Sequence, residues 1–162
     1  MLENPPQHDA GTPRASLVAT AMVRGREIEV WVGGAHTAIG LPITAESVKT
    51  AALVDCAGDL PLSLRTAALH FQPFVFLDVE ERPSAFPRLV EIVDGLVRQC
   101  HEISGPRQLH AVCTHGMNRS SLVAGLFLRR LGFDAEETVA LIRSARPGAL
   151  SNHSFVRLIG EA

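Results

Sequence analysis

Cysteine is scarce in this sequence, which limits the kinds of structure that the chain can form. The only cysteines are Cys56, Cys100 and Cys113, and no two of them lie close together in the chain. An odd number of dispersed cysteines argues against a framework of disulfide bonds and against a clustered zinc site. We therefore expect a protein of the reducing cytoplasm.

Long hydrophobic runs and lysine are also scarce. No apolar run approaches the roughly 18 to 20 residues that span a bilayer, and the N-terminus lacks the basic and apolar parts of a signal peptide. Lys49 is the only lysine, and the formal net charge is -2 at pH 7. This balance disfavours the basic surface that binds nucleic acids non-specifically. We expect no membrane partner, and we expect a monomer.

The composition is that of one globular domain. Of the 162 residues, 46% are hydrophobic and 20% are charged, which excludes a wholly disordered or fibrous chain. Residues 1–14 carry three prolines and few apolar side chains, so we expect a flexible N-terminal arm there. Residues 15–162 are then the single folded domain.

Helical and strand patterns alternate along this domain. Apolar residues at three- and four-residue steps predict an amphipathic helix over 84–100, and a short apolar run predicts a buried strand over 109–113. The order of all elements predicts an α/β fold, a single domain with a central mixed, mostly parallel sheet of about four to five strands flanked by helices. The other predicted elements are strands on both sides of a turn at 24–26, strands over 51–58 and 70–79, and helices over 45–51, 119–132, 134–146 and 151–160.

The segment VCTHGMNRSS is suited to bind phosphate. Cys113 ends a predicted strand, Arg119 opens a predicted helix, and five residues lie between them. Such a loop aims backbone N–H groups at one point, and the helix dipole adds partial positive charge there. Gly116 permits the tight turn, and the planar fork of Arg119 can hold two phosphate oxygens. The same field stabilises the thiolate of Cys113, which predicts a nucleophile aimed at phosphorus.

These residues carry a resemblance to a known family. Cys113, Gly116, Arg119 and Ser120 match the HCxxGxxRS signature of the cysteine-based protein tyrosine phosphatases, and the chain most resembles the small dual-specificity branch. The segment RSARPGALSNHSF (143–155) resembles the end of a downstream helix in that family, and WVGGAHTA (31–38) resembles its opening strand and turn. The resemblance covers roughly residues 27–160 and implies the phosphatase fold.

The resemblance also implies a mechanism that needs no metal or other cofactor. The Cys113 thiolate attacks phosphorus to form a phosphocysteine, and water then hydrolyses this intermediate. Ser120 stabilises the thiolate as it leaves in the second step. The family usually has a histidine before the cysteine, where this chain has Val112. The residues implied to hold the phosphate are Thr114, His115, Gly116, Met117, Asn118 and Arg119.

A general acid is expected on a loop that faces Cys113, because the leaving oxygen needs a proton. The family keeps an aspartate in the region that corresponds to residues 76–83 of this chain. Asp78 has the usual side chain but lies a little farther before Cys113 than is usual, whereas Glu81 has the better spacing. Both residues remain candidates.

The sequence leaves the substrate class open. The resemblance to dual-specificity phosphatases implies phosphotyrosine, phosphoserine or phosphothreonine in proteins, and small phosphate compounds are an alternative. The loop text CTHGMNR also resembles that of RNA 5′-triphosphatases of the same fold, so the 5′ end of RNA is a further alternative. Val112 and the unassigned acid also allow a pseudophosphatase that binds phosphate without turnover.

A second cysteine is predicted near the first. Cys56 ends a predicted strand, and the carboxyl ends of the strands in an α/β sheet gather at one edge. This position could place Cys56 beneath the Cys113 loop. A reversible disulfide on oxidation and an inert buried thiol are both compatible with that position.

Overall fold

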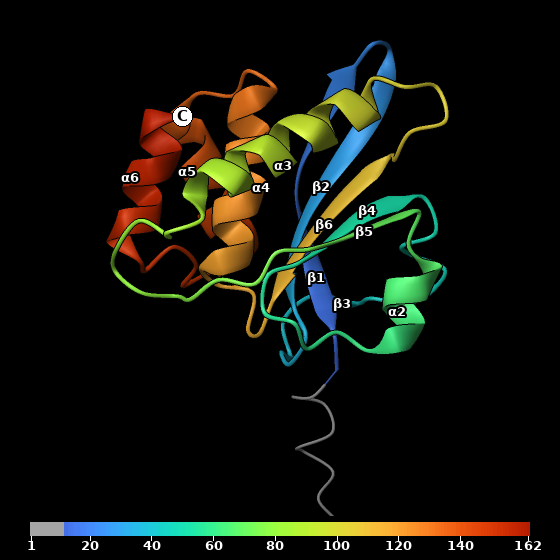
Figure 1. Ribbon diagram of the computed structural model, residues 1–162, viewed down its shortest axis with the longest axis horizontal. Coiled ribbons are helices and arrows are strands. Elements are labelled where there is room, and N and C mark those ends of the chain that lie inside the picture. Colours follow the sequence, from blue (N-terminus) through green and yellow to red (C-terminus); the bar gives the residue numbers. More distant parts are fainter. Residues whose placement is uncertain (1–11) are drawn as a thin grey trace, which may run out of the picture.

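The computed structural model describes residues 12–162, and a mixed six-stranded sheet forms its centre (Figure 1). The strand order is β3-β1-β2-β6-β4-β5. Pairing is parallel from β2 through β6 and β4 to β5, and β1 pairs antiparallel with both β2 and β3. The strands are β1 (Arg14–Val23), β2 (Arg26–Gly34), β3 (Leu41–Pro42), β4 (Ala51–Asp55), β5 (His70–Pro73) and β6 (Gln108–Cys113).

The expected α/β fold with a mixed, mostly parallel sheet is confirmed. The sheet has six strands where the sequence predicts about four to five. The additional strand is β3, whose two residues pair with Arg14 and Ala15 at the edge of the sheet. Two residues carry no period-two pattern, so the sequence holds no signal for this strand.

Helices cover the two faces of the sheet unequally (Figure 1). Four helices gather on one face and bury the larger apolar core, whereas α2 and the chain around Val48 cover the second, smaller core. No helix within residues 12–162 is long and apolar enough to cross a membrane. The helices are α2 (Leu62–Ala67), α3 (Phe86–Cys100), α4 (Arg119–Arg130), α5 (Ala135–Ala145) and α6 (His153–Glu161).

The unit of β6, a loop and α4 positions the site. All residues of β6 from Leu109 to Cys113 are buried, because β6 lies between β2 and β4 and is covered on both faces. Every residue of α4 from Ser120 to Leu128 is buried as well. The loop between them is therefore anchored at both ends in the core, at the carboxyl edge of the parallel strands.

Three predicted boundaries need correction. The helix predicted over 45–51 is a series of turns, in which Thr44 and Ser47 exchange hydrogen bonds before the chain enters β4. The strand predicted over 70–79 ends at Pro73, which has no N–H to donate, and the chain beyond is irregular. Of the arm predicted over 1–14, residues 12–14 are part of the fold, since Arg14 begins β1. Residues 1–11 lie outside the described residues.

The two C-terminal helices begin at side-chain caps. Asp134 accepts a hydrogen bond from the amide of Glu137 at 2.7 Å, and Asn152 accepts one from the amide of Phe155 at 3.2 Å. These bonds satisfy N–H groups that the first helical turn leaves unpaired. The predicted helices after Asp134 and near the C-terminus are thereby confirmed.

We expect Asp134→Ala to lower the free energy of unfolding by about 1 kcal/mol, because the variant loses the cap of α5. Urea unfolding measures this change. Glu136→Ala, in the same turn but without a capping bond, is the control and should change the free energy by less than about 0.5 kcal/mol. Equal losses in the two variants would contradict the capping role.

Candidate active site

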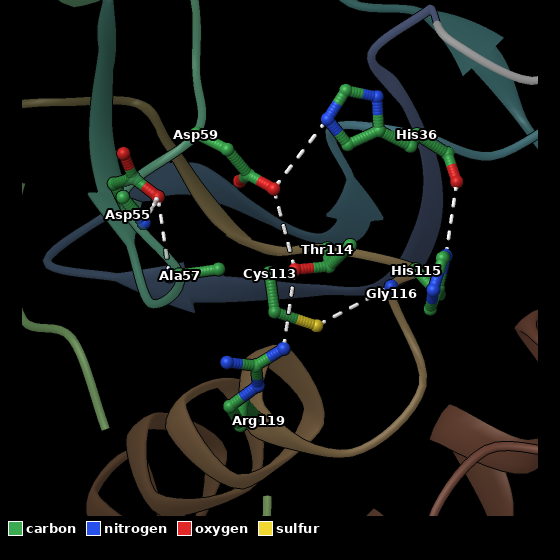
Figure 2. Close-up of polar contacts among 10 residues, drawn as sticks. His36, Asp55, Ala57, Asp59, Cys113, Thr114, His115, Gly116 and Arg119 are labelled. Carbon is green, nitrogen blue, oxygen red and sulfur yellow. Dashed lines mark hydrogen bonds and ion pairs between the residues drawn. The ribbon is translucent and has the colours of Figure 1, made fainter. Parts of the chain in front are cut away.

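The Cys113 thiol lies at the centre of the loop between β6 and α4 (Figure 2). Its Sγ atom is 3.3 Å from the amide nitrogen of Gly116, which donates to it, and 3.2 Å from Oγ of Ser120. Cys113 is only 3% exposed, and Ser120 is fully buried. An amide donor, a hydroxyl and the N-terminus of α4 thus surround the sulfur.

Arg119 extends its guanidinium along the same loop. Nη1 donates to the carbonyl oxygen of Phe76 at 3.2 Å, and Nη2 donates to Oγ1 of Thr114 at 3.1 Å. Nε is buried and has no hydrogen-bond partner among the described residues. Buried donors in proteins are nearly always paired, so this unpaired N–H next to Cys113 is suited to a phosphate oxygen.

Arg146 is fully buried and donates hydrogen bonds to carbonyl oxygens of the loop. Its Nε donates to the carbonyl oxygen of Gly116 at 2.6 Å, and Nη2 donates to that of His115 at 3.2 Å. Burial lowers the pKa of Arg146, and the charge of Cys113 opposes this shift. The sequence suggested Arg146 only as the end of a helix, because no local pattern tells a buried arginine from an exposed one.

The other predicted phosphate-binding residues take different positions. Thr114 contacts Arg119 through its hydroxyl, whereas the exposed His115 ring has Nδ1 at 3.1 Å from the carbonyl oxygen of His36. Met117 packs against the core, and its carbonyl accepts from the amide of Leu150 at 3.0 Å. The side chains of His115 and Met117 therefore have structural contacts, and only their backbone amides remain available to an anion.

Asp78 lies beside the loop, held by two asparagines. Its Oδ2 accepts from Nδ2 of Asn118 at 3.0 Å, and its Oδ1 accepts from Nδ2 of Asn152 at 2.9 Å. Both carboxylate oxygens of Asp78 thus accept hydrogen bonds from side-chain amides. Glu81, the other predicted acid, is exposed and lies along a groove with Val75 and Pro83.

Two residues that the sequence analysis did not single out complete the site. Asp59 lies on the loop after β4, and its Oδ2 accepts from Oγ1 of Thr114 at 3.3 Å. Nε2 of His36, on the loop after β2, is 3.5 Å from the same carboxylate oxygen (Figure 2). Both residues follow strands that neighbour β6, and the carboxyl ends of parallel strands lie at one edge of the sheet. This order in the sequence could have predicted that they lie near Cys113.

Two titratable groups near the loop are neutral around pH 7. Cys56 is fully buried next to Cys113, because its amide donates to the carbonyl of Val112 at 2.8 Å and so continues the β4–β6 ladder. Burial raises the pKa of Cys56 well above its ordinary value, and the charge of Cys113 raises it further. Burial also lowers the pKa of His110, which stacks on Trp31, to about 4.

Comparisons with known proteins give the fold. Neither models of protein families nor curated protein sequences match this chain. Among solved structures, Tk-PTP in its active form is 18% identical and has a TM-score of 0.61, with 91% of this chain and 97% of that chain covered. Human DUSP28 is 16% identical with a TM-score of 0.59, and 82% of this chain and 88% of that chain are covered.

A third structure is the human tyrosine phosphatase-like serine/threonine/tyrosine-interacting protein. It is 17% identical with a TM-score of 0.56, and 82% of this chain and 89% of that chain are covered. The fold implied by the resemblance to dual-specificity phosphatases is thus confirmed. Identities this low establish the fold alone, so the reaction has to be argued from the residues of the site.

We expect Gly34→Ala to displace the Cys113 loop. A Cβ atom on Gly34 would lie 2.6 Å from the carbonyl carbon of His115 and 2.7 Å from the carbonyl oxygen of Thr114. The affinity for inorganic phosphate should fall by about tenfold or more, because the hydrogen bonds of a charged ligand depend on undisplaced amides. Calorimetric titration measures this. Gly160→Ala, which meets open space, is the control, and unchanged phosphate affinity in Gly34→Ala would refute the argument.

Proposed function

We propose that this protein is a phosphatase that hydrolyses phosphate monoesters in phosphorylated proteins through a phosphocysteine on Cys113. The observation that carries the proposal is the convergence of three groups from one loop. The Cys113 sulfur, the Gly116 amide that donates to it and the buried, unpaired Nε of Arg119 lie together at the N-terminus of α4. A nucleophile, an amide that donates to it and an unpaired N–H suited to a phosphate oxygen are thereby combined.

The proposed reaction has two steps. In the first, a bond forms between the Cys113 sulfur and phosphorus, the bond from phosphorus to the leaving oxygen breaks, and that oxygen takes a proton. In the second, water attacks phosphorus, and the sulfur–phosphorus bond breaks to release the thiolate. Ser120, with Oγ at 3.2 Å from the sulfur, is placed to donate a hydrogen bond to that thiolate. Arg119 and the loop amides supply the positive charge, so the reaction as proposed needs no metal.

The surface beside the loop supports a polypeptide substrate over RNA. Asp78 and the following Glu80 and Glu81 are all exposed there and carry negative charge. The exposed apolar side chains of Leu77 and Val79 alternate with Asp78 and Glu80 in this segment. An acidic and apolar rim repels a polyanionic chain but suits a peptide. The similarity to RNA 5′-triphosphatases is confined to the text of the loop, so RNA ranks second.

The proposal is tested by phosphate release from a panel of phosphopeptides, an inositol phosphate and 5′-triphosphate RNA. We expect release from phosphopeptides by the wild-type chain and none by Cys113→Ser. Turnover only of RNA or only of the inositol phosphate would contradict the proposal and assign that substrate class to the site. Phosphate binding without any turnover would contradict the proposal and identify a pseudophosphatase.

We expect Arg119→Lys to lose about 100-fold or more in turnover although the charge is kept. An ammonium group cannot reproduce the planar set of donors that reaches Phe76, Thr114 and the phosphate together. Steady-state kinetics on one phosphopeptide measures this. Arg65→Lys, an exposed arginine of α2, is the matched control and should leave turnover unchanged. Wild-type turnover in Arg119→Lys would show that the fork is not required.

A further inference from the structure

We propose that Asp59, paired with His36, is the general acid and base of this active site. The inference rests on the proposed function, because it assigns the proton transfers of that reaction. It places the acid on the loop after β4, not on the segment 76–83 where the resemblance to dual-specificity phosphatases implies it. Asp59, Thr114 and His36 are brought together from three separate segments beside Cys113 (Figure 2).

The position of Asp59 is fixed by the backbone before it. Asp55 is the buried last residue of β4, and its Oδ1 accepts from the amides of Ala57 at 3.3 Å and Gly58 at 2.8 Å. Gly58 has a φ of +84°, which a side chain would disfavour. This tight turn reverses the chain immediately after the strand and carries Asp59 back to the Cys113 loop.

A chain of two hydrogen bonds connects Asp59 to the phosphate-binding arginine. Oγ1 of Thr114 donates to Oδ2 of Asp59 at 3.3 Å and accepts from Nη2 of Arg119 at 3.1 Å. The carboxyl group is therefore separated from the guanidinium by a single hydroxyl. The proposal requires that a phosphate ester held by Arg119 presents its leaving oxygen on this side of the loop, where Asp59 lies.

Asp59 and Asp78 differ in how many of their carboxyl oxygens have partners. Each oxygen of Asp78 accepts from an asparagine amide. In Asp59, Oδ2 has contacts with Thr114 and His36, while Oδ1 is buried and has no partner among the described residues. Buried polar atoms are nearly always paired, so Oδ1 of Asp59 is the one oxygen of these two carboxyl groups that is open to a further contact.

His36 is a positioning residue that also links Asp59 to solvent. Its amide donates to the carbonyl of Thr114 at 2.9 Å, so the backbone of this residue is tied to the loop. The imidazole is 48% exposed and its Nε2 is 3.5 Å from the carboxylate. His36 therefore connects the Asp59 carboxyl group both to the backbone of Thr114 and to solvent.

The proton balance closes with these residues. As the sulfur–phosphorus bond forms, the proton of Asp59 moves to the leaving oxygen, and Asp59 becomes a carboxylate. In the second step that carboxylate takes a proton from the attacking water, whose oxygen bonds to phosphorus. Asp59 is then protonated again, and the Cys113 thiolate is restored.

The test compares two substrates that differ in their leaving groups. Phenyl phosphate leaves as a basic phenolate that needs a proton, whereas para-nitrophenyl phosphate leaves without one. In Asp59→Asn we expect turnover of phenyl phosphate to fall about 100-fold or more, and turnover of para-nitrophenyl phosphate to fall less than about tenfold. Asp59→Glu keeps an acid and should recover part of the loss. His36→Gln should show the same selectivity with a smaller loss.

Asp78→Asn is the matched control, because it makes the same change in the other carboxylate beside the loop. We expect its loss to be equal on the two substrates. Equal losses in Asp59→Asn would mean that Asp59 only positions Thr114 and Arg119, and a selective loss in Asp78→Asn or Glu81→Gln would assign the acid there; either result overturns the inference. If Cys113→Ser kept the turnover of the wild-type protein, the proposed function would be overturned instead, so the two failures are distinguishable.

Discussion

The buried guanidinium of Arg146 is the constraint on which the loop depends. A peptide unit is planar, so its carbonyl and its N–H point in opposite directions. The carbonyl of His115 accepts from Arg146, and the N–H of the same peptide unit, on Gly116, donates to the Cys113 sulfur. Arg146 also donates to Ser16 of β1 and to the carbonyl of Ile39. One side chain thus ties the loop to the sheet and turns a peptide dipole toward the thiol.

Two adjacent thiols have opposite environments. Cys56 and Cys113 are the residues that come directly after Asp55 and Val112, which are partners in the β4–β6 pair. Burial raises the pKa of Cys56 and so keeps it a neutral thiol. Cys113 differs through contacts that strand position alone does not give, namely the Gly116 amide, the Ser120 hydroxyl and the start of α4. In the proposed reaction, one thiol attacks phosphorus and the other adds no charge beside it. Position in the sheet brings the two sulfurs near each other, and the loop makes them different.

Local patterns predicted those parts of the fold that depend on local physics. The apolar periodicity before Cys100 gave α3, and the strand, loop and helix around Cys113 gave the site, because each signal lies within a few neighbouring residues. The short length of β5 and the turns after Thr44 depend on which backbone groups find a partner strand in the sheet. The local sequence does not encode that pairing. Asp59, His36 and Arg146 were missed for the same reason, since their partners lie far away in the chain.

The burial of α4 has a consequence for how a ligand is recognised. Every residue from Ser120 to Leu128 is buried, so Arg119 and the loop before it rest on a helix that cannot shift without disturbing the core. The amides around Cys113 are then preorganised, and an anion that enters pays little for rearranging them. Discrimination between ligands must come from the surrounding exposed segments, which differ in shape and charge, and not from a loop that remodels itself around each one.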